Sequence, residues 1–242
     1  MGSPTNEALR GSDEVQHVVT ISRGFWMEKF LLTQEDYLAV VGSNPSYFNG
    51  FRFPTDYGTD LTRPVEFVNW FDASNYCALR TQQERAAGLL PTNYVYRLPT
   101  ESEWEYASRA GTTTAFYLGS GLHSGQANFN GQAEYDAALG RIDNPNGSWL
   151  QKTTPVGSYA ANGWGLCDMI GNVLEWCQDW YDAYPTGPVT DPQGAIMGPG
   201  RVFRGGAWIA LAQNCRSAQR RYIMPSNTGY YFGFRVVLAL SQ

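Results

Sequence analysis

The segment from Arg204 to Arg235 constrains the fold more than any other part of this 242-residue chain. Short runs that each contain an arginine recur in it at 204–208, 215–218 and 233–235, with Pro225 between the last two. The first and the last of these runs also contain glycine and an aromatic residue. Apolar, tyrosine and small residues fill the intervals. Arginine suits planar structural contacts with several hydrogen bonds better than lysine does. We therefore expect the arginines to brace a rigid frame, while the intervening positions differ in character.

Composition predicts a globular protein with much irregular structure. Charged residues make up 16% of the chain and hydrophobic residues 43%. Gly, Asn, Asp and Pro are dense from 111 to 199, where Trp149, Trp164, Trp176 and Trp180 are expected to pin the loops. Loops of this length are unusual unless they are functional or are held by something besides an apolar core. Bound metal is one candidate.

Three helices are predicted from their capping residues. Thr33 precedes a helix that should end at Gly42, and Asn69 precedes a second helix with Asp72 three residues on. Thr100 and Glu103 have the spacing of a capping box at the start of a third helix. Late strands are expected near 202–208 and 234–239. Residues 1–14 are expected to be a disordered leader or a tag remnant, and residues 15–242 a single domain.

Charge and hydropathy argue against several classes of partner. The net charge of −5 gives no reason to expect nucleic acid, and no apolar run is long enough for membrane insertion. The N-terminus lacks the apolar core of a signal peptide, so a cell-surface or secreted location requires that a natural leader was removed. Four cysteines are too few for a disulfide scaffold, and any pairing among them stays open. We expect a monomer.

Several motifs, in a consistent order, carry a resemblance to a known family. They include Val68-Asn69-Trp70, the run from Arg97 to Glu105, Gly171-Asn172-Val173 with Glu175-Trp176, and the frame from Arg204 to Arg235. Together they resemble the formylglycine-generating enzyme (sulfatase-modifying factor) family over nearly all of the chain beyond residue 14. The resemblance implies an α+β fold, the variant of the C-type-lectin fold that is typical of this family, rich in irregular loops. Proteins of this fold include oxidases, sulfoxide synthases and ligand-binding proteins diversified by retroelements, so the fold does not settle the function.

The resemblance also implies a structural calcium ion. The matching segment of the family binds calcium through a side chain at Asp168, backbone carbonyls at Gly171 and Val173, and a carboxylate at Glu175. Calcium takes oxygen ligands of these types, often on irregular loops. The alternative is that Asp168 and Glu175 cap turns and pair with arginine. A second family site would use Asn128 and the carbonyl of Phe129, but its acidic residue is not evident here.

The positions of the cysteines indicate whether this chain can perform the oxidation that is typical of the family. The family oxidase binds copper between two cysteines, because copper(I) prefers soft thiolate ligands. In this chain the first of those positions is Ala210, an active-site serine position is Ala207, and the second cysteine position is Cys215. One thiol cannot supply a two-coordinate site, so we expect no copper and a structural Cys215, either free or paired with Cys177. His17 and His123 do not supply the histidine-rich site of the sulfoxide synthases.

The residues between the frame positions are candidates for a ligand-binding surface. In retroelement-diversified proteins of this fold the C-terminal segment has the same layout, and tyrosine offers a large contact area at a low entropy cost. The candidate ligand-binding residues are Trp208, Ile209, Ala210, Leu211, Arg221, Tyr222, Ile223, Met224, Tyr230 and Tyr231. The alternative is that the apolar members simply pack in the core.

We therefore expect a non-catalytic protein that binds a protein or glycan ligand through its C-terminal segment and that belongs, on one interpretation, to the retroelement-diversified class. One alternative is an oxidase of the sulfatase-modifying-factor type, or another enzyme of the same fold. A second alternative is a structural module of a larger surface assembly.

Overall fold

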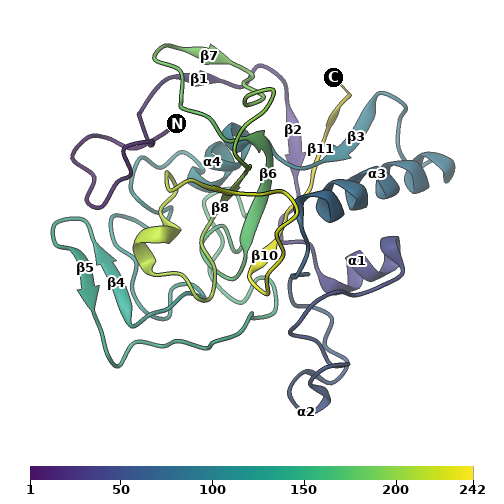
Figure 1. Ribbon diagram of the computed structural model, residues 1–242, viewed down its shortest axis with the longest axis horizontal. Helices are drawn as coiled ribbons and strands as arrows, with labels where there is room; N and C mark the ends of the chain where they lie inside the picture. Colours follow the sequence, from purple (N-terminus) through teal and green to yellow (C-terminus); the bar gives the residue numbers. More distant parts are fainter. Residues whose placement is uncertain (242) are drawn as a thin grey trace.

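The computed structural model describes residues 1–241 and has an α+β fold in which short elements are joined by long ordered loops (Figure 1). The helices are α1 (Gln34–Val41), α2 (Pro54–Tyr57), α3 (Trp70–Ala86) and α4 (Glu101–Arg109), with a 3₁₀ helix η1 (Ala212–Cys215). The strands are β1 (Val19–Thr20), β2 (Phe25–Met27), β3 (Tyr94–Arg97), β4 (Ala133–Asp136), β5 (Gly140–Asp143), β6 (Leu174–Trp180), β7 (Val189–Thr190), β8 (Arg201–Arg204), β9 (Arg221–Ile223), β10 (Phe232–Gly233) and β11 (Val237–Leu240).

Four small sheets organise these strands. The largest has the order β10-β6-β8-β9, in which β10 pairs with β6 in parallel and the other pairs are antiparallel. The second has the order β2-β11-β3 and is antiparallel. β1 pairs with β7, and β4 pairs with β5. The late strands predicted near 202–208 and 234–239 correspond to β8 and β11, each displaced by one or more residues.

The helix ends follow the predicted capping residues. The amide of Asp36 donates to Thr33 Oγ1 at 3.1 Å, and Gly42 ends α1 in the left-handed conformation at φ 81°. Asn69 and Asp72 form a reciprocal capping box at the start of α3, as Thr100 and Glu103 do at the start of α4. These side chains satisfy amide groups that the first helical turn leaves unpaired. All three helix starts are confirmed.

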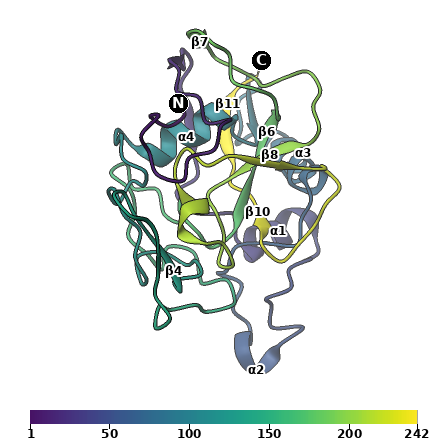
Figure 2. The ribbon, with the colours of Figure 1, turned by 60° about the vertical axis from the view of Figure 1, so that its left-hand side comes forward.

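The main core lies between the helix pair α1–α3 and the sheets. Its centre is aromatic: Trp176 stacks on Phe232 with ring centroids 4.8 Å apart, and Tyr37 stacks on Tyr76 at 5.6 Å. The segment of residues 44–60, which contains α2, extends away from this core, and Figures 1 and 2 show it projecting in both views. This segment is the α2 extension. Within residues 1–241, no helix combines the length and the apolar character that crossing a membrane requires.

The N-terminal segment departs from its prediction as a disordered leader. Ser3 and Glu14 are buried, and the Ser3 amide donates to the Glu14 carbonyl at 3.0 Å. The guanidinium of Arg216, far along the chain, donates hydrogen bonds to the carboxylates of Glu7 and Glu14 and so forms ion pairs with this segment. Chain termini are commonly poorly ordered unless other contacts hold them. Here the ion pairs with the buried Arg216 hold residues 1–14, so the prediction of disorder was wrong.

Candidate functional site

Four buried arginines hold the C-terminal frame in place. Each pairs with a carboxylate from another part of the chain: Arg204 with Glu105, Arg216 with Glu14, Arg220 with Glu101, and Arg235 with Glu175. Arg204 also donates to the carbonyls of Ser217, Ala218 and Gln219 at 2.8–2.9 Å. A buried charge is tolerated when it is paired and its donors are satisfied. Arg204, Arg216 and Arg235 belong to the frame predicted from the sequence, which buried ion pairs therefore hold, and Arg220 adds a fourth pair.

A cavity of about 240 Å³ opens beside this frame, between β8, η1 and β9. Four of the predicted binding residues line it: Ala210, Arg221, Ile223 and Tyr231. Aromatic side chains from β8 and β10, Phe203 and Phe232, form part of its wall, and Asn214 lies at its polar side. The structure therefore brings together residues that are separated by up to 21 positions in the sequence.

Cys215 lies buried next to the cavity and is only 1% exposed. Burial raises the pKa of its thiol to about 12, so the group stays protonated at neutral pH. A Cβ added at Gly206, whose φ is +75°, would lie 2.3 Å from Cys215 Sγ, so the glycine is what allows the backbone to cross the thiol. Cys77, Cys167, Cys177 and Cys215 are all free and buried, which removes the pairing considered for Cys177 and Cys215.

The other predicted binding residues divide into exposed and buried groups. Ile209, Tyr222, Met224 and Tyr230 are exposed, with Met224 the most exposed at 59%. The Tyr222 ring lies against that of Tyr181, with centroids 4.2 Å apart. Leu211 is half-buried and precedes η1.

Trp208 differs from its prediction as a surface residue, because it is only 5% exposed. Its Nε1 donates to the Tyr230 carbonyl at 3.0 Å, and its ring stacks on the Tyr230 ring at 5.8 Å. Trp208 also packs against Phe48, which comes from the segment preceding α2. Its side chain therefore supports Tyr230 from behind and cannot offer much surface to a ligand.

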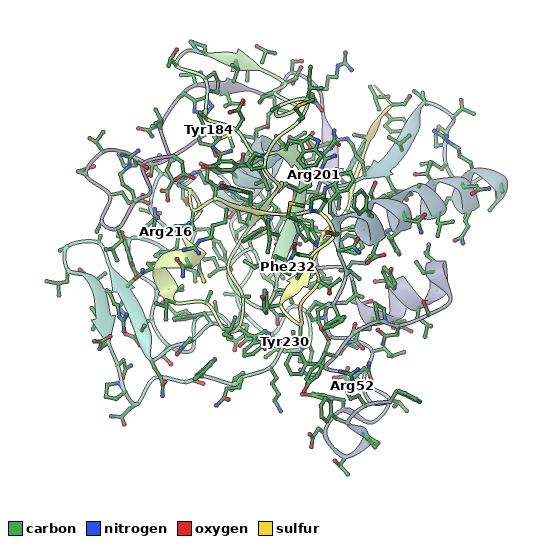
Figure 3. The ribbon with its side chains drawn as sticks, in the orientation of Figure 1. Arg52, Tyr184, Arg201, Arg216, Tyr230 and Phe232 are labelled. Atoms are coloured by element: carbon green, nitrogen blue, oxygen red, sulfur yellow. The ribbon has the colours of Figure 1, made fainter. Side chains whose placement is uncertain are left out.

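An aromatic cluster joins the α2 extension to the C-terminal segment. Tyr230 packs against Tyr47 and Phe48 with centroids 5.4 and 6.3 Å apart, and the guanidinium of Arg52 lies 4.7 Å from the Tyr47 ring centroid. In Figure 3, Tyr230 lies between Phe232 and Arg52, at the base of the extension. The extension is thus packed against Tyr230 at the edge of the C-terminal segment.

A buried carboxyl group anchors this extension. Glu66 is fully buried, its Oε1 accepts from the Phe48 amide at 2.8 Å, and its Oε2 has no hydrogen-bond partner. Burial raises the pKa of Glu66 to about 7, although the amides of Phe48 and Tyr47 act in the opposite direction. The extension is therefore held by a group that changes charge near neutral pH.

Sequence reasoning missed two phenylalanines that border the predicted surface. Phe67, which precedes α3, and Phe71, in the first turn of α3, are 40% and 54% exposed. The Phe67 amide donates to the Gly229 carbonyl at 3.2 Å, and the Trp70 amide donates to the Pro225 carbonyl at 3.1 Å, so this helix end lies beside the C-terminal segment. Phe67 has φ +67°, an unfavourable conformation for a bulky residue. No residue pattern marks such strain.

The predicted calcium ligands fit the ion only in part. Asp168 is buried, its Oδ2 accepts from the Gly157 amide at 2.6 Å, and its Oδ1 lacks a partner. The carboxylate oxygens of Glu175, in contrast, accept from Arg235 at 3.1 and 3.4 Å. Gly171 and Val173 lie between them on the loop leading into β6, and a Cβ on Gly171 would meet the Asn128 carbonyl at 2.3 Å. Across residues 1–241, acidic, histidine and cysteine side chains do not form a group of three or more that could hold a metal ion. Asp168 is the ligand that fits, and calcium at this loop stays a prediction.

Comparison with known proteins shows the wider relationships. The chain is 32% identical to the formylglycine-generating enzyme of Streptomyces coelicolor over a 250-residue alignment, which covers 97% of this chain and 70% of that protein. It is 37% identical over 177 residues to the serine/threonine-protein kinase pkn1 of Chlamydia caviae, covering 71% of this chain. The chain spans only 23% of the length of that kinase.

Solved structures share the whole fold. Treponema denticola variable protein 1 superposes with a TM-score of 0.75 at 28% identity, covering 98% of this chain and 92% of that one. PvdO from Pseudomonas aeruginosa has a TM-score of 0.75 at 25% identity, covering 99% and 90%. The α+β fold implied by the resemblance, the formylglycine-generating-enzyme variant of the C-type-lectin fold, is confirmed. The model of the sulfatase-modifying factor enzyme 1-like domain matches residues 1–240, and the chain belongs to that family.

Proposed function

We propose that this protein is a non-catalytic ligand-binding member of its family. Its binding face consists of the cavity residues Ala210, Arg221, Ile223 and Tyr231 together with the exposed residues Phe67, Phe71, Ile209, Tyr222, Met224 and Tyr230. The observation that carries the proposal is the cavity itself, which lies next to Cys215 and to which Ala210, Arg221 and Tyr231, from between the frame positions, contribute. Aromatic residues that surround a pocket are typical of energetically important binding sites.

The chemistry at the cavity supports binding over oxidation. The family resemblance places a cysteine at each of two positions, but Ala210 has a methyl group at the first, and the Cys215 thiol at the second is buried with its pKa raised to about 12. The thiolate is the form of cysteine that reacts and binds metals. A single protonated thiol therefore lacks the ligands and the reactivity on which the family oxidation depends.

Buried structural residues alternate with exposed residues in the C-terminal segment, which supports variation of the binding face. The frame arginines are buried and paired, whereas Tyr222, Met224 and Tyr230 are exposed between them. Treponema denticola variable protein 1, which shares this fold, is named for variation. We infer that positions 209–211, 221–224 and 230–231 can change without disturbing the frame, as a retroelement-diversified binding protein requires.

A paired selection and activity experiment tests the proposal. Random peptides displayed on yeast are selected against the wild-type protein, and the recovered clones are compared on Tyr222→Ala/Tyr230→Ala and on Leu89→Ala, a control beyond the far end of α3. We expect the selected clones to bind Leu89→Ala with the same affinity as wild type and to bind the double variant at least tenfold more weakly. In parallel, copper-loaded protein is incubated with a cysteine-containing sulfatase peptide. Aldehyde formation with turnover, or clones indifferent to the face variant, would overturn the proposal.

A further inference from the structure

We infer that the cavity beside Arg221 accepts an apolar side chain of an acidic polypeptide segment, whose carboxylate lies on the Arg221 guanidinium. This inference rests on the proposed function and specifies the ligand of the same site. It is carried by three observations: the charge distribution of the C-terminal segment, the size of the cavity, and the small number of free polar groups around it.

The C-terminal fifth of the chain has no acidic side chain of its own. Asp191 is the last acidic residue, while arginines follow at 201, 204, 216, 220, 221 and 235. Arg204, Arg216, Arg220 and Arg235 are neutralised by carboxylates from elsewhere, as described above. Arg201 lies between two indole rings, 3.8 Å from the Trp70 centroid and 4.1 Å from the Trp180 centroid. Arg221 is the exposed arginine of this segment, whereas Arg201 is half-buried against these rings.

Arg221 is exposed at the mouth of the cavity, and its guanidinium is weakly engaged. Its Nη2 donates to Asn214 Oδ1 at 3.3 Å. Among residues 1–241, no carboxylate lies within ion-pair distance of Arg221. An arginine can bind a carboxylate through two parallel hydrogen bonds, which are stronger than bonds between neutral groups. The protein has net charge −5, so this local excess of positive charge is a property of the face and not of the chain.

The cavity is of the size of a side chain. Its volume of about 240 Å³ lies below the ~300–1,000 Å³ that is typical of pockets for drug-sized ligands. Leu174, Phe203, Ile223 and Phe232 give it an apolar wall. Burial of an apolar side chain from a partner would remove this wall from water, which favours binding.

The few polar groups at the cavity favour a polypeptide over a glycan. Gln219 already accepts from Arg216 Nη2 at 3.0 Å and donates to the Arg220 carbonyl at 3.3 Å. Asn214 Oδ1 is shared with Arg221. A sugar needs partners for several hydroxyl groups, since a buried polar group without a hydrogen bond is costly. An apolar side chain beside a single carboxylate matches the cavity and Arg221 without such a cost.

The test uses small probes that differ only in charge. 3-Phenylpropionate, 3-phenylpropanamide and 3-phenylpropylamine are titrated into protein labelled at the methyl groups of Ala210 and Ile223, and binding is followed by NMR. We expect both methyl signals to shift with 3-phenylpropionate, with an affinity about fivefold or more above that of the amide and a greater margin over the amine. Arg221→Gln should remove the preference, Arg221→Lys should retain part of it, and Arg23→Gln, a control outside the cavity, should leave it unchanged.

A second arm tests the class of ligand. The peptides Gly-Glu-Phe-Gly and Gly-Gln-Phe-Gly, with blocked ends, are compared with 3′-sialyllactose. Binding of the Glu peptide above the Gln peptide at the same methyl groups supports the inference. Equal binding of both peptides, binding of sialyllactose alone, or the absence of any shift with all probes would overturn it. If the small probes fail but the yeast selection still yields clones that depend on Tyr222 and Tyr230, the inferred ligand is wrong and the proposed binding function survives. If the probes and the selection both fail, the inferred ligand and the proposed function are both wrong.

Discussion

Arg216 and Glu14 form a buried, two-bond ion pair that closes the N-terminal segment over η1. The distances from Arg216 Nη1 and Nη2 to the Glu14 oxygens are both 2.7 Å, and both side chains are fully buried. Glu7 provides a second carboxylate to the same guanidinium. The N-terminal segment is thus coupled directly to the frame that carries the binding face.

Replacing Glu14 should therefore destabilise the whole domain. Glu14→Gln removes the negative charge that pairs with the buried Arg216 guanidinium, and we expect a loss of about 3 kcal/mol in the free energy of unfolding. Although burial alone would raise the pKa of Glu14, hydrogen bonding and charge from Arg216 hold it below its ordinary value of 4.5. The stabilisation is therefore complete above about pH 4.5 and is lost as the pH falls through the lowered pKa.

Urea unfolding at pH 7 and at pH 3 checks this prediction. The difference in the free energy of unfolding between wild type and Glu14→Gln should be smaller at pH 3 than at pH 7. Asp143→Asn, which breaks the exposed pair with Arg141, is the control and should cost less than about 1 kcal/mol. Equal stabilities of the Glu14 variant and the control would show that the N-terminal segment contributes little.

Glu66 should make the α2 extension sensitive to pH near neutrality. Its pKa, raised by burial to about 7, lies above the ordinary 4.5, so the folded state binds the proton more tightly than the unfolded state. Stability should then fall as the pH rises from about 4.5 to 7, by about 2–3 kcal/mol from this group. Glu66→Gln keeps an acceptor for the Phe48 amide but cannot ionise, so its stability should exceed that of wild type at pH 8 and approach it at pH 5.

The local effect of Glu66 can be followed by hydrogen exchange. The Phe48 amide, which donates to Glu66, should exchange faster in wild type than in Glu66→Gln at pH 8, after correction for intrinsic rates. The Tyr37 amide in α1, which donates to the Thr33 carbonyl, serves as the reference. If the exchange rate of the Phe48 amide has the same pH dependence in wild type and in Glu66→Gln, Glu66 is not the group that ionises.

Phe67 should reveal its backbone strain through a comparison of Gly and Ala. At φ +67°, Ala retains the strain of the left-handed region, whereas Gly does not. We expect Phe67→Gly to be more stable than Phe67→Ala by about 1 kcal/mol in urea unfolding. At Phe71, within the first turn of α3, the order should reverse because Gly is unfavourable in helices. If Phe67 contributes to binding, Phe67→Gly should weaken the selected clones while leaving the fold intact, and unchanged affinity would remove Phe67 from the binding face.

Calcium should stabilise the loop that contains Asp168. The unpartnered Oδ1 of Asp168 is buried, and a cation there would satisfy it. A ligand bound only by the folded state stabilises it by mass action, so chelation with EGTA should lower the melting temperature by roughly 5–10 °C, and added calcium should restore it. Asp168→Ala should abolish the response, and Asp143→Asn should retain it. A melting temperature that exhaustive chelation leaves unchanged would contradict the prediction.

Sequence reasoning succeeded where a local interaction determines the structure. Thr33, Asn69 and Thr100 each cap the helix that follows, because the hydroxyl or amide needed by the first turn lies within three residues. Four of the cavity-lining residues, Ala210, Arg221, Ile223 and Tyr231, could also be found, since the resemblance supplied the register of the frame. Both kinds of inference depend on neighbours in the sequence or on a known alignment of motifs.

The features that were missed depend on contacts between distant segments. Glu14 is buried only because Arg216 reaches it across 202 positions. Trp208 is buried because the α2 extension places Phe48 on its ring, and Glu66 is unusual only because that same extension covers it. No periodicity or capping pattern encodes such pairings, and the left-handed conformation of Phe67 has no compositional signal.

The pairing of the frame arginines with remote carboxylates has a practical consequence for protein engineering. Because the stabilising partners of Arg204, Arg216, Arg220 and Arg235 lie outside the C-terminal segment, the exposed positions between them form a compact target for a combinatorial library. Randomising Ile209, Tyr222, Met224 and Tyr230 would alter recognition while the anchoring charges stay fixed. The domain should therefore serve as a scaffold from which reagents against new targets can be selected without rebuilding its interior.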